Sequence, residues 1–142
     1  MRIAIGSDHA GFPHKDVLNV YLTEKGHEVV DYGAENAIDS VDYPDFAQAV
    51  ARAVASGEVE RGILVCGTGI GMAIAANKVP GVRAANVVSP EFAALARQHN
   101  DANVITISAR FVDLATNGAI VDAFLETAFE GGRHQGRVDK ME

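Results

Sequence analysis

Cysteine and positive charge are both scarce in this 142-residue chain, which has a single cysteine and 12 Lys and Arg against 19 Asp and Glu. One cysteine excludes an intrachain disulfide framework and a cysteine-based zinc site. We therefore expect a reducing compartment, the cytoplasm. No apolar run approaches the ~20 residues that a bilayer-spanning helix needs, and the first residues show strand character rather than an apolar signal region. No membrane association is predicted.

The formal net charge of −7 argues against a general nucleic-acid or anionic-membrane partner. Any anionic ligand must then be held by a local cluster of positive groups. No spacing typical of metal ligands, such as H-E-x-x-H, occurs, and neither the dinucleotide fingerprint nor a Walker A loop is present. We therefore expect neither a metal site nor a cofactor.

Apolar strand patterns alternate with helix patterns along the whole chain, which predicts parallel strands joined by crossover helices. We expect one domain over residues 1–142 with an α/β, three-layer, Rossmann-like (flavodoxin-like) fold and a parallel sheet of about five strands. The common strand order 2-1-3-4-5 would place the ends of the first and third strands side by side. The expected strands are Arg2–Gly6, His27–Tyr32, Arg61–Cys66, Val82–Val88 and Asn103–Ile107, and the last expected helix is Val112–Phe129.

The stretch Gly62–Lys78 joins the third strand to a helix through the only cysteine and a glycine-rich turn. Cys66 at a strand end, just before a helix, is in a position that favours a thiolate, although most lone cysteines are buried packing residues. The turn either allows strand and helix to pack closely or presents backbone N–H groups to an anion. Its spacing alone supports both interpretations equally. The turn consists of Gly67, Thr68, Gly69, Ile70 and Gly71.

Other polar residues have ordinary structural explanations beside functional ones. Asp8 and His9 follow the first strand and would face Cys66, but could be a cap and a surface histidine. His99 and Asn100 end a helix, where a histidine can pair with the helix dipole or act as a general acid. We expect His99 to approach Cys66 from this helix. The tail is either solvated or a phosphate site. Its basic residues are Arg133, His134 and Arg137, and Arg110 after the fifth strand is a similar candidate.

Five segments in order carry a resemblance to a known family: IAIGSDHAG, DYPDFA, GILVCGTGIGMAIAANK, RQHNDANV and EGGRHQGRV. With these segments the chain resembles the type B ribose-5-phosphate isomerases, which belong to the sugar-phosphate isomerase family that also contains the galactose-6-phosphate isomerase subunits. The resemblance covers essentially the whole chain. It implies a metal-independent interconversion of ribose 5-phosphate and ribulose 5-phosphate through a cis-enediolate.

The resemblance also implies a role for each candidate residue. Cys66 would be the base that moves a proton between C1 and C2, as in the branch of the family that has cysteine there and no glutamate at the position of Met72. His99 would open the sugar ring, and Thr68 would lie close to the enediolate. The implied substrate contacts are Asp8, His9, Gly67, Gly69, Ile70, Gly71, Asn100, Arg110, Arg133, His134 and Arg137, with the arginines holding the phosphate. A homodimer with shared sites is implied, and a dimer of dimers is compatible with it.

Three alternatives remain open. The loop Ala34–Val41 departs from the family pattern, so the substrate could be another sugar phosphate of four to six carbons, of the allose, galactose or erythrose type. A non-catalytic sugar-phosphate sensor would keep the glycine turn and the arginines without a reactive thiol. A thiol hydrolase using Cys66 and His99 would need a leaving-group site, which nothing in the sequence indicates.

Overall fold

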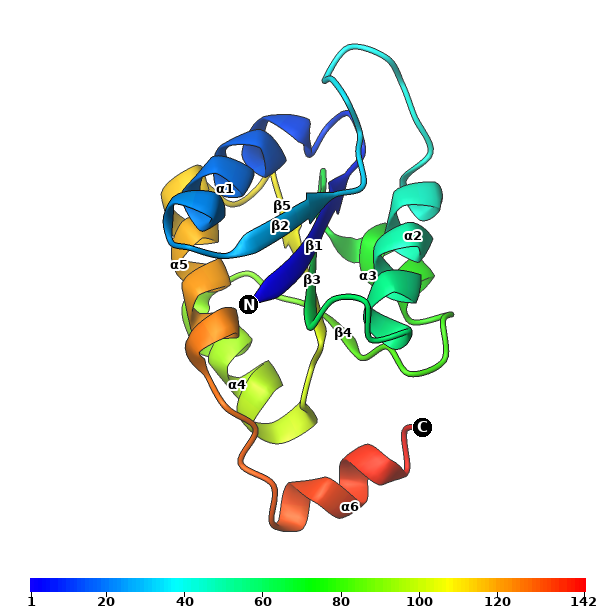
Figure 1. Cartoon of the computed structure of the whole chain (residues 1–142), viewed down its shortest axis with the longest axis vertical. Helices are drawn as coiled ribbons and strands as arrows, with labels where there is room; N and C mark the ends of the chain where they lie inside the picture. Colours follow the sequence, from blue (N-terminus) through cyan, green and yellow to red (C-terminus); the bar gives the residue numbers. More distant parts are fainter.

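The computed structural model describes all 142 residues and contains a five-stranded, all-parallel sheet with helices on both faces (Figure 1). The predicted flavodoxin-like α/β fold is thereby confirmed. None of the helices combines the length and apolar character that crossing a membrane requires. The elements are β1 (Arg2–Ser7), α1 (Phe12–Glu24), β2 (Glu28–Asp31), α2 (Tyr43–Ala55), β3 (Arg61–Cys66), α3 (Ile70–Ala76), β4 (Ala84–Asn86), α4 (Pro90–Asn100), β5 (Val104–Ser108), α5 (Leu114–Glu126) and α6 (Arg133–Asp139).

Two hydrophobic cores lie on the two faces of the sheet. Successive residues of a strand point to opposite faces, so Ile3 and Ile5 of β1 pack in a core with α1, α4 and α5, while Ala4 packs in the other core with α2 and α3. All three side chains are fully buried. A strand covered on both faces must be apolar throughout. This explains why the central strands read as short continuous apolar runs.

The strand order differs from the expected one. The structure has the order β2-β1-β3-β5-β4, so β5 lies beside β3 and β4 forms the edge. Every residue of β5 is buried, whereas β4 has only the three residues Ala84–Asn86, all partly or fully exposed. The apolar NVITI run therefore takes the central position, and most of the expected strand Val82–Val88 is connecting loop. The predicted neighbours β1 and β3 do pair directly.

The C-terminal third also departs from the prediction. Helix α5 begins at Leu114, because the Asp113 carboxylate caps it by accepting the N–H of Thr116 at 2.7 Å. It ends at Glu126 rather than Phe129. No helix was predicted beyond that point, yet α6 forms with His134 buried on its inner side. Figure 1 shows α6 crossing the lower end of the molecule, near the end of α4.

The turn after β1 packs directly on the end of β3. The N–H of Asp8 donates to the Val65 carbonyl oxygen at 3.3 Å, and the Asp8 carboxylate accepts the N–H of Gly11 at 2.9 Å. A Cβ on Gly11 would lie 2.2 Å from that same Val65 oxygen, which is far inside van der Waals contact with a backbone atom. Glycine is therefore required here so that the Asp8 turn can approach β3.

Two glycine-to-alanine variants test this contact. Gly11→Ala should lower the free energy of unfolding by about 1–3 kcal/mol, because the backbone must shift to admit the methyl group. Gly118→Ala is the control, since it lies inside α5 with no atom within 4 Å of the new Cβ. It should raise the free energy of unfolding by about 0.5–1 kcal/mol through helix propensity. Urea denaturation measures both, and a harmless Gly11→Ala would contradict the steric argument.

Candidate active site

The carboxyl ends of β1 and β3 bring the predicted polar turns together. Ser7 pairs with Val65 in register, and the Asp8 N–H bonds to Val65, so Asp8 and His9 lie beside Cys66. Asp8 is buried and His9 is partly exposed. Parallel strands end at one edge of a sheet, which is where such folds hold their ligands. The predicted proximity of Asp8-His9 to Cys66 is thus confirmed.

Cys66 is the last residue of β3, and its side chain is nearly buried, at 6% exposure. Its sulfur accepts the backbone N–H of Gly69 at 3.1 Å. A donor aimed at the sulfur is the kind of contact that a cysteine acting as a base or nucleophile uses. The neighbouring apolar residues, among them Met72, also make Cys66 part of a hydrophobic core. The thiol is therefore both a packed side chain and a directed one.

Two glycines of the turn, Gly69 and Gly71, are needed for packing. Gly69 has φ +84°, and a Cβ there would lie 2.5 Å from Oδ1 of Asn86. A Cβ on Gly71 would lie 2.5 Å from the ring of Tyr43, and one on Gly67 would touch the Arg110 guanidinium group at 3.4 Å. The sequence left open whether the glycines serve close packing or anion binding, and these contacts show that they serve close packing. Tyr43 and Asn86 approach the turn from other elements.

The same turn also presents free donors. The Ile70 N–H donates to Thr68 Oγ1 at 3.1 Å and the Gly69 N–H to Cys66, so these two donors are used within the turn. The N–H groups of Thr68 and Gly71 have no acceptor in the chain. Two backbone donors beside a thiol can stabilise a negatively charged oxygen. Packing and anion binding are thus compatible in this turn.

Ser108, which the sequence analysis missed, fixes the direction of this turn. Its hydroxyl donates to the Gly67 carbonyl oxygen at 2.7 Å, and the Arg110 N–H donates to the same oxygen at 3.1 Å. In a trans peptide the N–H points opposite to the C=O. Holding the Gly67 carbonyl against β5 therefore turns the Thr68 N–H away from β5. The sequence analysis missed Ser108 because it placed β5 at the edge of the sheet, whereas β5 lies beside β3.

A buried polar network supports Ser108 from α5. Asn117 donates its side-chain amide to the Ser108 carbonyl oxygen at 2.9 Å and lies 2.9 Å from Nδ1 of His14. Burial lowers the pKa of His14, and the charge of Asp113 opposes that shift. A neutral imidazole can accept the Asn117 amide hydrogen, whereas a charged one cannot. The end of β5 is consequently held by side-chain bonds as well as by the sheet.

The loop Ala34–Val41 forms part of the rim through His9. The Val41 N–H donates to Nδ1 of His9 at 3.2 Å. When the ring is neutral, the proton is then on Nε2, which leaves that nitrogen as a donor. A hollow of about 740 Å³ lies under this loop and is lined by Lys15 and Asp31 rather than by Cys66. Those two side chains form a salt bridge of 2.8 Å.

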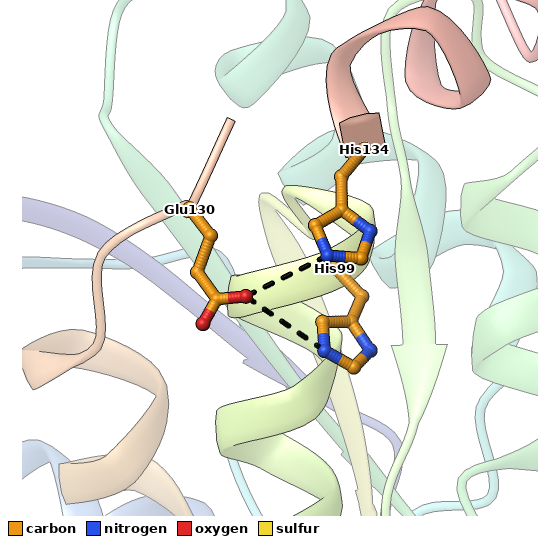
Figure 2. Close-up of side chains that lie close together, drawn as sticks. All are labelled: His99, Glu130 and His134. Carbon is orange, nitrogen blue, oxygen red and sulfur yellow. Dashed lines mark ion pairs between the residues drawn. The ribbon is translucent and has the colours of Figure 1, made fainter. Parts of the chain in front are cut away.

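The remaining predicted residues gather at the opposite end of the molecule. His99 ends α4 and His134 begins α6, and their rings stack with centroids 4.4 Å apart (Figure 2). Nε2 of each ring faces the same Glu130 oxygen, at 3.9 Å from His99 and 3.6 Å from His134. Burial lowers the pKa of His134, and the charges of His99 and Arg133 lower it further. Asn100, Arg133 and Arg137 are exposed around this pair.

This placement corrects the expectation that His99 approaches Cys66 from the next helix. The Gly62 N–H donates to the Asn103 carbonyl oxygen at 3.0 Å, at the start of β3 and β5 and just after α4. Cys66, by contrast, pairs with Ser108 at the ends of the same two strands. Four strand steps, about 13 Å at 3.3 Å per residue, separate these two levels. One chain therefore brings together Asp8, His9, Cys66, Gly67, Thr68, Gly69, Ile70, Gly71 and Arg110, and separately His99, Asn100, Arg133, His134 and Arg137.

Comparison with known proteins places the chain in a family. A family model described as Ribose/Galactose Isomerase matches residues 3–141. Ribose-5-phosphate isomerase B of Escherichia coli (strain K12) is 50% identical over 140 residues, which cover 99% of this chain and 93% of that protein. Both comparisons span almost the whole chain.

Solved structures give the same result. The ribose-5-phosphate isomerase B of Clostridium thermocellum has a TM-score of 0.97 and 50% identity, covering 99% of this chain and 95% of that one. The Mycoplasma genitalium ribose-5-phosphate isomerase B, crystallised with bound ribulose-5-phosphate, has a TM-score of 0.95 and 51% identity, covering 99% and 93%. With the family model matching nearly every residue, this chain belongs to the ribose/galactose isomerase family.

Proposed function

We propose that this protein is an aldose–ketose isomerase that interconverts ribose 5-phosphate and ribulose 5-phosphate. The observation that carries the proposal is the thiol of Cys66 at the carboxyl edge of the sheet, beside Asp8 and next to free backbone donors. The relatives support the choice of sugar, because a 51% identical protein binds ribulose-5-phosphate. We place the protein in the cytoplasm. The proposed reaction needs no metal or cofactor.

The proposed reaction uses Cys66 as the base. The thiolate takes the proton from C2 of the open-chain aldose, which gives a cis-enediolate with its negative charge on O1. The proton of the O2 hydroxyl passes to O1, and the Cys66 thiol returns its proton to C1, which gives the ketose and restores the thiolate. A base of this kind typically contributes 10²–10⁴-fold in rate. The N–H groups of Thr68 and Gly71 would stabilise the enediolate oxygens, and losing one such donor typically costs about 10²–10³-fold. The Thr68 hydroxyl is held by the Ile70 N–H, which supports its place near these oxygens.

The rest of the site would bind and open the sugar. His99 would open the ring, while Asp8 and His9 would contact the sugar. The backbone of Gly67, Gly69 and Ile70 would shape the pocket floor. Phosphate would be held by positive groups, which the acidic chain concentrates in few places. The proposed phosphate and sugar contacts are Asn100, Arg110, Arg133, His134 and Arg137.

A homodimer would unite the two halves of the site. Cys66 and His99 lie at opposite edges of the sheet in one folded copy, so a second copy would supply the His99 half of the site. Large apolar side chains are exposed around the β4 edge, which supports a protein partner there. They are Ile70, Ile74, Val88, Phe92 and Leu95, each at least 41% exposed. A dimer of dimers remains a prediction.

Isomerase assays across sugar phosphates test the function. We expect the highest kcat/KM with ribose 5-phosphate, against the 6-phosphates of allose and galactose and erythrose 4-phosphate. Another sugar is the second candidate, because the divergent loop Ala34–Val41 contacts His9. Cys66→Ala should lower kcat by at least about 10²-fold and leave sugar-phosphate binding largely intact.

Alkylation with iodoacetamide provides the control. Cys66 is the only cysteine, so it is the only thiol that the reagent can label. Ribose 5-phosphate should slow the labelling. Protection without turnover of any sugar would favour a sensor, and a covalent acyl-enzyme in mass spectra would favour a thiol hydrolase.

Hybrid dimers test the shared site. Cys66→Ala and His99→Asn homodimers should both be nearly inactive on ribose 5-phosphate. Mixing them with subunit exchange makes hybrids in which one site has both native residues, so about a quarter of the native activity should return. Mixing without exchange, checked by native mass spectrometry, is the control. No recovery in proven hybrids would place both residues in the same subunit's site or outside it.

Replacing Ser108 tests how the turn is oriented. Ser108→Ala removes one donor to the Gly67 carbonyl, and we expect kcat on ribose 5-phosphate to fall about tenfold or more while KM changes little. Ser7→Ala is the control, because that buried hydroxyl on β1 has no hydrogen-bond partner. It should leave kcat and KM unchanged. Equal effects of both variants on kcat would assign Ser108 a role in packing alone.

A further inference from the structure

We propose that His99, Glu130 and His134 form a binding site for a divalent transition-metal ion of the zinc class, and that an ion bound there inhibits the enzyme. The binding part stands on the geometry of the three side chains. The inhibition part rests on the proposed function, because His99 belongs to the proposed site. The absence of a metal-binding motif from the sequence does not exclude the site, since its ligands come from α4, the loop before α6 and α6 itself.

The three side chains converge on one point. Figure 2 shows both imidazole rings turning Nε2 toward one oxygen of Glu130, at 3.9 Å from His99 and 3.6 Å from His134. The ligand atoms of all three residues lie within 4.8 Å of one another. A tetrahedral zinc with bonds of about 2.0–2.1 Å holds neighbouring ligand atoms about 3.3 Å apart. The two nitrogen–oxygen distances must therefore close by about 0.3 and 0.6 Å, and the two nitrogens, which lie up to 4.8 Å apart, by up to about 1.5 Å. Rotation of the partly exposed His99 side chain supplies this movement.

The backbone fixes the three positions while two of the side chains can adjust. The Glu130 N–H donates to the Gln98 carbonyl oxygen at 3.1 Å, which ties the Glu130 loop to the last turn of α4. His134 is buried, so its ring is the fixed ligand. The side chains of His99 and Glu130 are 41% and 51% exposed. Both can rotate toward an ion, which reaches them directly from solvent.

The ligand set selects the class of metal. Two imidazole nitrogens and one carboxylate oxygen suit zinc and its neighbours in the first transition series, whereas magnesium and calcium prefer oxygen ligands alone. Three protein ligands leave a fourth position open, as in non-structural zinc sites. The exposed Arg133 and Arg137 on α6 carry positive charge and oppose a cation. We therefore expect weaker binding than at a closed four-ligand zinc site, in the manner of a reversible inhibitor.

Bound metal would interfere with the sugar half of the proposed site. Coordination occupies the Nε2 lone pair of His99 and holds its ring, so that nitrogen can no longer exchange a proton with a sugar ring. The ion also blocks His134, a proposed substrate contact. Zinc should therefore inhibit the isomerase reversibly, and a chelator should restore the activity.

Calorimetric titration of zinc into chelator-treated protein tests the binding. Glu130→Gln and His134→Gln should each weaken zinc binding at least tenfold, because each removes one ligand. The matched controls are Glu126→Gln, an exposed carboxylate on α5, and His27→Gln, a histidine outside the cluster; both should bind zinc like the native chain. Cys66→Ser must also bind zinc normally, since the thiol is the competing soft ligand. Unchanged affinity in Glu130→Gln, or loss in Cys66→Ser, would overturn the site.

Activity measurements separate the two parts of the proposal. With native protein, zinc should inhibit ribose 5-phosphate isomerisation over the same concentrations that saturate the site in calorimetry. Glu126→Gln and His27→Gln should be inhibited over the same zinc concentrations as the native protein. Saturated binding without inhibition would overturn the inhibitory role. If no sugar phosphate is turned over at all, the proposed function fails, but weakened zinc binding in Glu130→Gln would still uphold the metal site.

Discussion

In a parallel α/β sheet every strand ends at one edge, and every crossover helix ends at the other. This constraint decides where each proposed site residue of the protein lies. Cys66 ends a strand and His99 ends a helix, so one copy of the chain must hold them at opposite ends. The Cys66 thiol and the cluster formed by His99, Arg133, His134 and Arg137 could then meet only between two copies of the chain. The proposed division of the site between two copies follows from the order of strands and helices rather than from local detail.

The two parts of the proposed site, one around Cys66 and one around His99, are built by different interactions. The Cys66 half depends on close backbone packing, in which Gly11 touches the Val65 carbonyl and Gly69 and Gly71 admit Asn86 and Tyr43. Such contacts leave no room for a methyl group, and they therefore fix the positions of the thiol and of its neighbouring N–H donors. Precision of this kind is what general-base catalysis beside an oxyanion requires.

Hydrogen bonds from arginine hold the His99 half. Arg97, 4% exposed, donates to the carbonyl oxygens of Thr127 and Ala102 and to the Asp101 carboxylate. Arg83 pairs with Asp101 and with Glu142, which ties the chain end beyond α6 to the sheet. A helix of seven residues with only two buried side chains has little hydrophobic stabilisation of its own. These charged contacts explain how α6 can be ordered near α4 despite its polar sequence.

Much of this arrangement could be predicted from the sequence, and the misses have physical causes. The alternation of apolar strands and helices predicted the fold and the pairing of β1 with β3, hence Asp8 beside Cys66. The order of β4 and β5 was wrong because both read as apolar runs, although only β5 is long enough to be buried on both sides. That error hid Ser108, whose neighbour Gly67 lies across the β3–β5 pair. Glu130 was missed because a tertiary contact, the bond from its N–H to the Gln98 carbonyl oxygen, places it beside His99. The expectation that His99 approaches Cys66 was also wrong, because a strand end and a helix end lie at opposite edges of a parallel sheet and cannot meet within one chain.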